Sequence, residues 1–320
     1  MSAASPDGRA ENGLPGFLGG LRIDRSRRLR ELLSGPDFLM APGAADPLTA
    51  RLIEEAGFPI CYVTGAGIAN QRYGMADVGL TTGTEIVDAV RAIATATALP
   101  TICDADTGYG NAINVMRTVH EFERAGAAGI QLEDQVTPKR CGHFAGKDVI
   151  DAVEMVQKIR AAVAARSNPD FIIVARTDAR AVHGLDEALA RARAFRDAGA
   201  DVLFVEAPKT IEEMARIPAE VPGVPHLANM VEGGRTPILP AADLAKLGFK
   251  IAIYANFCLR VAARAIQEGL VHLAATGSSA GYEDRMISMT ERQRLVSLPQ
   301  IEQLEQRYLS LDFAGRPVAE

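Results

Sequence analysis

Cysteine is scarce in this 320-residue chain, and its four cysteines show no C-x-x-C spacing. Four thiols are too few to cross-link a chain of this size, so we expect them to be reduced. The first 20 residues contain no apolar run long enough for a secretion signal or a membrane span. We therefore expect residues 1–20 to be a disordered tail and the protein to be cytoplasmic.

Positive charge is not in excess either. The formal net charge of −6 argues against a protein that binds nucleic-acid phosphates without regard to sequence. Hydrophobic residues make up 48% of the chain and charged residues 23%, so it can bury a large core. These values exclude wholesale disorder and leave a globular protein.

Short apolar runs recur along the chain, and amphipathic segments rich in Ala, Arg, Glu and Leu separate them. Eight runs have the length and composition of buried strands: residues 38–41, 60–63, 101–104, 129–133, 171–176, 202–206, 226–229 and 251–256. The clearest helical patterns cover residues 84–97, 112–125, 152–165 and 186–198.

Glycines end several of these units. Gly57, Gly126, Gly199 and Gly248 each precede the next apolar run, where a helix end favours left-handed backbone. No GxGxxG follows the first strand, although a Rossmann dinucleotide site would carry one. Eight strand–helix units therefore predict an α/β fold of the (β/α)8 TIM-barrel type.

The alternation stops after Gly269. Residues 290–309 form a charged helical stretch with few large apolar side chains, which can pack on the barrel or on a neighbouring subunit. We expect residues 21–320 to form a single barrel domain with C-terminal helices.

Polar side chains end five consecutive predicted strands. Catalytic groups of such barrels project from the carboxyl ends of the strands, where alternate residues share a face. The residues are Asp104 with Asp106, Glu133, Arg176, Glu206 and Asn229.

Three of these carboxylates would repel one another in a partly dry pocket, so a cation is needed to offset them. Oxygen ligands without a His/Cys cage indicate Mg2+, or Mn2+, rather than Zn2+. We expect Asp104 and Asp106 nearest the metal, with Glu133 behind them. Capping or salt-bridging of loops is the alternative.

Two other features of the same rim suit an anion. The turn Thr64-Gly65-Ala66-Gly67 offers backbone N–H groups and a hydroxyl, although a tight turn explains it equally well. Arg176 offers a planar fork to a substrate carboxylate, with Asp178 as an alternative, structural partner.

Cys141 stands among cations in Lys139-Arg140-Cys141-Gly142-His143. Nearby positive charge stabilises a thiolate, and a glycine-flanked loop can expose the sulfur. We interpret Cys141 as catalytic. The other cysteines lie in apolar strands or a helix and are expected to be small buried hydrophobes: Cys61, Cys103 and Cys258.

These motifs resemble the isocitrate lyase/phosphoenolpyruvate mutase superfamily, and the methylisocitrate lyase branch looks most similar. The resemblance rests on residues 62–67, 104–110, 133–135, 139–143, 175–179 and 227–230. Residues 139–143 favour the carbon–carbon lyases of the superfamily over its phosphonate mutases. Residues 229–237 look more like the 2,3-dimethylmalate lyase and oxaloacetate hydrolase branches.

The resemblance also implies roles for the rim residues. The carboxylate of a 2-oxo acid would be held by Thr64, Gly65 and Ala66. Mg2+ would be bound, directly or through water, by Asp104, Asp106 and Glu133. Substrate would be contacted by a gating loop and the pocket walls: Cys141, Gly142, His143, Arg176, Glu206 and Asn229. A further substrate carboxylate would be held by Arg260 and Arg292.

The activity implied is a retro-aldol type cleavage of a 2-hydroxy di- or tricarboxylate similar to 2-methylisocitrate. The products would be pyruvate or a related 2-oxo acid, plus succinate or a related acid. Cys141 would protonate the carbanion-like product, and Tyr62 or a metal-linked carboxylate would take the hydroxyl proton. Cations around Cys141 favour thiolate, so Glu133 or another carboxylate would have to restore its proton.

Other activities of the superfamily remain open at this point. They are oxaloacetate hydrolysis or decarboxylation, 2,3-dimethylmalate cleavage and a phosphonate phosphorylmutase; a non-enzymatic barrel scaffold is the alternative from another class. The resemblance also implies a homotetramer with exchanged C-terminal helices.

Overall fold

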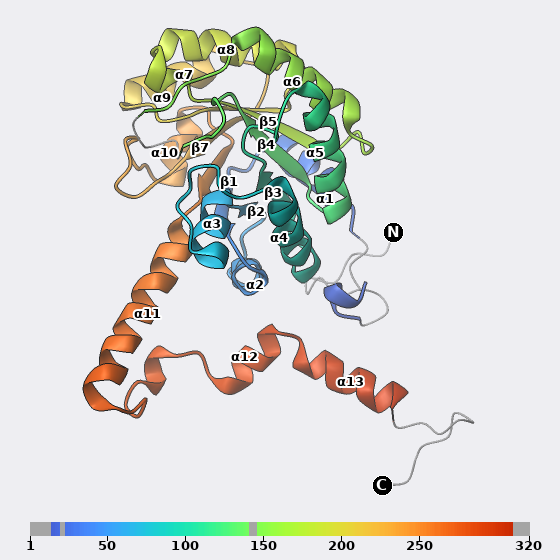
Figure 1. Ribbon diagram of the computed structural model, residues 1–320, viewed down its shortest axis with the longest axis vertical. Coiled ribbons are helices and arrows are strands. Elements are labelled where there is room, and N and C mark those ends of the chain that lie inside the picture. Colours follow the sequence, from blue (N-terminus) through green and yellow to red (C-terminus); the bar gives the residue numbers. More distant parts are fainter. Residues whose placement is uncertain (1–13, 20–22, 141–145, 310–320) are drawn as a thin grey trace.

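The computed structural model describes residues 14–19, 23–140 and 146–309. Eight parallel strands close into a barrel in chain order, and β1 pairs with β8 to complete it. The strands are β1 Leu39–Ala44, β2 Cys61–Val63, β3 Thr101–Asp104, β4 Gly129–Glu133, β5 Ile172–Thr177, β6 Val202–Val205, β7 His226–Asn229 and β8 Ile251–Tyr254. The predicted (β/α)8 barrel is confirmed, and every predicted strand overlaps an observed one (Figure 1).

Helices surround the barrel (Figure 1). They are α1 Arg25–Ser34, α2 Pro47–Glu55, α3 Gly65–Tyr73, α4 Gly83–Ala96, α5 Ala112–Ala125, α6 Ala152–Ala165, α7 Ala179–Val182, α8 Leu185–Asp197, α9 Ile211–Glu220 and α10 Ala241–Lys246. The next helix, α11 Phe257–Thr276, extends away from the barrel (Figure 1). The side chains of Thr82 and Glu85 form a capping box that starts α4. The four glycines predicted at helix ends all have positive φ.

Alternate residues of each strand divide the core into two parts. One part lies inside the barrel and contains the inward-facing apolar side chains. They include Ile102 of β3, Val174 of β5 and Phe204 of β6, and Leu29 and Leu33 of α1 join the same cluster. The larger part lies between the strands and the surrounding helices. Side chains alternate between the two faces of a strand, so the residue two positions after each of Ile102, Val174 and Phe204 also faces inward. That residue lies at the carboxyl rim of the barrel.

The C-terminal helices form an arm that leaves the barrel (Figure 1). Helix α11 has 20 residues, none of them buried. The helical stretch predicted over residues 290–309 is two helices, α12 Met289–Leu295 and α13 Leu298–Tyr308. They are separated at Ser297, which has a φ of 66°. Among the described residues, no helix is both long and apolar enough to cross a membrane.

Candidate active site

The carboxylates at the end of β3 are buried at the barrel rim. Asp104 and Asp106 are 8% and 6% exposed, and the backbone N–H of Asp106 donates to Asp104 Oδ1 at 3.2 Å. Gln131 Nε2 of β4 lies 3.5 Å from the same oxygen, and Gln131 Oε1 accepts from the Tyr62 hydroxyl at 3.1 Å. The pairing of β3 with β4 thus joins the acid pair to Tyr62.

The glycine-rich turn after β2 lies directly against this acid pair. Thr64 caps α3, and its hydroxyl oxygen accepts from the N–H of Gly67 at 3.1 Å. A Cβ atom on Gly65 would lie only 3.0 Å from Asp104 Oδ2, so the close approach requires glycine. The structure therefore brings the predicted anion-binding turn next to the predicted metal site.

Lys139 supplies positive charge on this side of the rim. Its side chain is 6% exposed, its Nζ lies 2.9 Å from Asp106 Oδ1, and it also forms an ion pair with Asp77. Burial by itself lowers the pKa of Lys139, but Asp106, Asp104 and Glu133 outweigh that effect and raise it well above its usual value. Sequence reasoning counted Lys139 only as a neighbour of Cys141 and missed these contacts.

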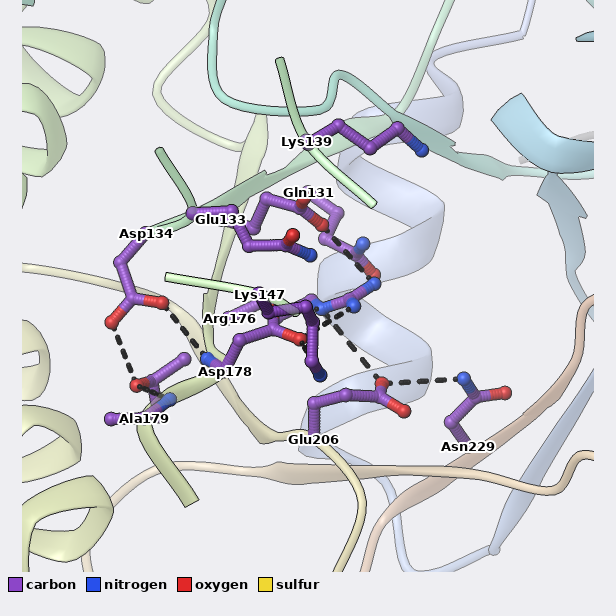
Figure 2. A network of polar contacts seen from close by, with 12 residues as sticks. Gln131, Glu133, Asp134, Lys139, Lys147, Arg176, Asp178, Ala179, Glu206 and Asn229 are labelled. Atoms are coloured by element: carbon purple, nitrogen blue, oxygen red, sulfur yellow. Dashed lines mark hydrogen bonds and ion pairs between the residues drawn. The ribbon is translucent and has the colours of Figure 1, made fainter. Parts of the chain in front are cut away.

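Arg176 of β5 is the second cation of the rim. Its Nη1 lies 3.2 Å from Glu133 Oε2, and its Nε lies 2.9 Å from Asp178 Oδ2 and 3.8 Å from Glu206 Oε2. The guanidinium also lies over the ring of Phe204, 5.2 Å from its centroid. Asp178, the structural partner considered from sequence, is therefore present (Figure 2).

A network of buried charged and polar side chains holds Arg176 in place (Figure 2). Asp178 accepts from two nitrogens of Arg176 and from Lys147 Nζ, which lies 2.6 Å away. Asp134 accepts from the Thr177 hydroxyl at 2.7 Å and from the N–H of Asp178 at 2.8 Å. Arg191 of α8 donates to the same Asp134 carboxylate at 3.0 Å. Apart from Asp178, these supporting residues had no role in the sequence analysis, because their common signal is burial of charge, which appears only in three dimensions.

Burial changes the proton affinity of the rim acids. Burial, and then repulsion from Asp106, raises the pKa of Asp104 to about 6. Burial likewise raises the pKa of Glu133 well above its usual value, against the effect of Arg176. The pKa of Tyr62 is raised well above 10 by burial and by Asp104, so its phenol stays protonated and donates to Gln131. A further positive charge near Asp104 and Glu133 would stabilise their ionised forms and so lower the pKa of each.

The rim residues fit a hard divalent cation held partly through water. Among the described residues, no group of three or more His, Cys, Asp or Glu side chains forms a cage for a metal ion. Mg2+ commonly binds through one or two carboxylates and keeps several waters. Glu133 Oε1 and Asn229 Oδ1 are buried oxygens with no hydrogen-bond partner within the described ranges, and they could accept from such waters. Asp104 and Asp106 would hold the ion, with Glu133 further out.

The other predicted residues lie in different places. Asn229 Nδ2 donates to Glu206 Oε2 at 3.3 Å, which keeps both in the rim network. Arg260 lies in the first turn of α11 and donates to the backbone oxygen of Glu232 at 2.6 Å. Ala66 lies in the first turn of α3. Predicted loop residues outside the described part of the chain are Cys141, Gly142 and His143.

Arg292 is not brought to the rim of its own barrel. It lies on α12, which contacts the outer helix α2. Its neighbour Arg294 forms an ion pair with Glu55, the last residue of α2, and Arg51 donates to the Leu295 carbonyl. Since α2 begins at the rim and runs antiparallel to the strands, its last residue points toward the opposite end of the barrel.

Two of the three cysteines predicted to be buried hydrophobes are buried. Cys61 and Cys103 are fully buried, and burial raises the pKa of Cys103 to about 12. Cys258 is only half-buried on α11.

An acid pair, a glycine turn and a buried arginine meet at the carboxyl rim of a closed barrel, which is where barrel enzymes carry their active sites. Residues 29–274 match the family model described as phosphoenolpyruvate phosphomutase. The 2,3-dimethylmalate lyase of Eubacterium barkeri is 49% identical over 286 residues, which cover 89% of this chain and 99% of that protein. A protein named "Probable 2-methylisocitrate lyase 2" from Corynebacterium glutamicum is 45% identical, over 86% of this chain and 88% of its own length.

Solved structures agree with these relatives. The structure of an oxaloacetate acetylhydrolase with 3,3-difluorooxalacetate superposes with a TM-score of 0.84 at 36% identity, covering 88% of this chain and 96% of that one. A phosphonopyruvate hydrolase complex with oxalate and Mg2+ gives 0.81 at 32% identity, covering 90% and 100%. The chain belongs to the phosphoenolpyruvate mutase/isocitrate lyase superfamily, and it is a lyase of that superfamily.

Proposed function

We propose that this lyase uses Mg2+ to cleave the C2–C3 bond of a 2-hydroxydicarboxylate of the 2,3-dimethylmalate type. The products would be a 2-oxo acid and a second carboxylic acid. The observation that carries this proposal is the rim itself, where a Cβ on Gly65 would lie 3.0 Å from Asp104 Oδ2 and Arg176 reaches Glu133 on the neighbouring strand. The relative named 2,3-dimethylmalate lyase and the Mg2+ complex of the phosphonopyruvate hydrolase support it.

The chemistry of cleavage assigns tasks to this chain's residues. The C2 hydroxyl loses its proton, the C2–C3 electron pair passes to C3, and C3 then takes up a proton. For 2,3-dimethylmalate the products are pyruvate and propionate. A bound Mg2+ would neutralise charge on the 2-oxo acid oxygens.

The N–H groups after Thr64 would hold the carboxylate of the 2-oxo acid, because they lie at the first turn of α3 beside Asp104. Arg176 would stabilise the oxygen at C2, since its fork is fixed by Asp178 before substrate arrives. Fixing the fork in advance reduces the reorganisation needed in the transition state.

Glu133 is our candidate for the base that takes the hydroxyl proton. Its Oε1 is buried and accepts no hydrogen bond within the described part of the chain, so a lone pair is available to the hydroxyl proton. Tyr62, the other candidate, already donates its hydroxyl hydrogen to Gln131 Oε1. The predicted acid for C3 remains Cys141.

A tricarboxylate such as 2-methylisocitrate is the second candidate substrate, because relatives near 45% identity carry that name. One feature favours the dicarboxylate. Arg260, expected to hold the extra carboxylate, is paired with Glu232.

Substrate competition tests the choice. The purified protein with Mg2+ is given 2,3-dimethylmalate, 2-methylisocitrate and oxaloacetate in separate assays, and kcat/KM and products are measured. We expect the highest kcat/KM for 2,3-dimethylmalate, with propionate and pyruvate in equal amounts. A higher kcat/KM for 2-methylisocitrate with succinate formed, or oxalate and acetate from oxaloacetate as the main reaction, would reject the dicarboxylate assignment.

We also propose a homotetramer in which the C-terminal arm packs on neighbouring subunits. Helix α11 carries apolar side chains that are between 46% and 70% exposed: Val261, Ile266, Leu270, Val271 and Leu273. Such a contiguous exposed apolar surface is typical of a subunit interface. Arg292 on this arm would then be available to the site of a neighbouring subunit.

A further inference from the structure

Lys139 lies beside the candidate metal site, in an ion pair with Asp106. Its ammonium is buried between Asp106 Oδ1, at 2.9 Å, and the carboxylate of Asp77. The side chains of the two acids are themselves only 9% and 14% exposed, so solvent screens these ion pairs weakly. The other rim cation, Arg176, is turned toward Glu133 and Asp178 and contacts neither Asp104 nor Asp106 in the described structure.

A divalent cation at Asp104 and Asp106 would compete with Lys139 for the Asp106 carboxylate, whose Oδ1 lies 2.9 Å from the ammonium. A metal ion binds a carboxylate oxygen through its lone pairs, which also attract the ammonium, so this oxygen cannot serve both cations well. Two cations within a few ångströms also repel each other strongly in a pocket that is poor in water.

We propose that Lys139 is a resident counter-cation, and that a divalent cation binding at Asp104 and Asp106 displaces its ammonium. The inference rests on the proposed Mg2+ site. It makes two statements about this chain. The apparent affinity for the metal is lower than the carboxylates alone would give, and the Lys139 side chain becomes exposed when the metal binds.

The chain offers a matched control in Lys158 of α6. Its side chain is also 6% exposed, and its Nζ lies 3.4 Å from the carbonyl oxygen of Thr107, next to Asp106. Its acidic partner is Glu154, 3.7 Å away and half-exposed, which is outside the rim. Lys158 therefore reports on loss of a buried lysine near β3 without loss of a contact to the site.

The first experiment titrates Mn2+ into each protein and follows free Mn2+ by electron paramagnetic resonance. We expect Lys139→Met to bind Mn2+ more tightly than the wild type, by about tenfold or more, because a cation at ion-pair distance is removed. Lys139→Arg, which keeps the charge, and Lys158→Met should stay within about twofold of the wild type. Unchanged or weaker binding by Lys139→Met would overturn the inference.

The second experiment uses the wild-type protein, so it does not depend on a variant that folds. Lysines are acetylated with limiting acetic anhydride, with and without saturating Mg2+, and the peptides are quantified by mass spectrometry. Lys139 should be protected without Mg2+ and react several-fold faster with it, while Lys158 stays unchanged. Equal protection of Lys139 in both states contradicts displacement.

Different results would overturn the proposed metal-dependent function and the role of Lys139 as a counter-cation. A wild-type protein that binds neither Mn2+ nor Mg2+ overturns the proposed metal-dependent function together with this inference. Normal Mn2+ binding with no effect of Lys139→Met removes the counter-cation alone and leaves the proposed lyase intact.

Discussion

The ion pair between Lys147 and Asp178 offers a quantitative test of how the arginine of the site is held. The two side chains are 2% and 0% exposed, and Nζ lies 2.6 Å from Oδ1. We consider Lys147→Met, Asp178→Asn and the double variant. Removing one partner of a buried pair leaves the other charge uncompensated, at a typical cost of about 3–5 kcal/mol.

The structure ranks the two single variants within that range. Lys147→Met should cost about 3 kcal/mol, because Asp178 keeps two hydrogen bonds from Arg176. Asp178→Asn should cost about 5 kcal/mol, because Lys147 and Arg176 both lose their shared anion. Once Asp178 is neutral, removing Lys147 no longer strands a charge. The double variant should therefore cost about 5–6 kcal/mol rather than the additive 8, a coupling of about 2–3 kcal/mol.

The assay is the free energy of unfolding from urea denaturation, with the m value checked for constancy. If the two single effects are additive, or if each is below about 1 kcal/mol, Lys147 and Asp178 do not act as a coupled buried ion pair. The exposed pair of Arg216 and Asp186, which are 2.7 Å apart, is the control and should show no measurable coupling. With substrate, Asp178→Asn should lower kcat/KM more than Lys147→Met, because Asp178, unlike Lys147, contacts the Arg176 fork.

Three further predictions follow from the rim and the arm. Gly65→Ala places a Cβ 3.0 Å from Asp104 Oδ2, so Mn2+ affinity should fall by about tenfold in the resonance titration; unchanged affinity contradicts the close approach. The pKa of Asp104 is raised to about 6, so this group stabilises the metal-free fold below pH 4 and that stability is lost as the pH rises through 6. Urea denaturation from pH 4 to 7 should show a decline of up to about 3 kcal/mol that Asp104→Asn lacks; equal pH dependence of the two proteins would argue against the shift. Leu270→Asp, on the exposed face of α11, should give smaller particles on sizing chromatography, whereas Val153→Asp, equally exposed on α6, should not; no change with Leu270→Asp rejects the arm as an interface.

The barrel and its rim could be predicted because both depend on short-range periodicity. Apolar runs of strand length give the positions of the strands, and a period of two then places Asp104, Glu133 and Arg176 inside the barrel at its carboxyl rim. Since all eight strands are parallel and end at the same rim, these side chains converge irrespective of the conformation of the loops.

The pairing of charges could not be predicted in the same way. Asp134 and Arg191 are 57 residues apart, and their contact depends on how α8 packs against β5 and β6. Lys139 lies on a loop, and the path of that loop brings it to Asp106 and Asp77. A loop has no sequence periodicity from which such a path could be predicted. The break between α12 and α13 was missed because residues 290–309 are helical in composition on both sides of Ser297.

Mg2+-dependent cleavage is tested most directly by pyruvate release from 2,3-dimethylmalate, followed with a coupled dehydrogenase before and after chelation of divalent cations. We expect steady release with Mg2+, loss of release with excess chelator, and recovery when Mg2+ is restored. Release that continues undiminished in chelator, or no cleavage of this substrate with Mg2+ present, would contradict this expectation.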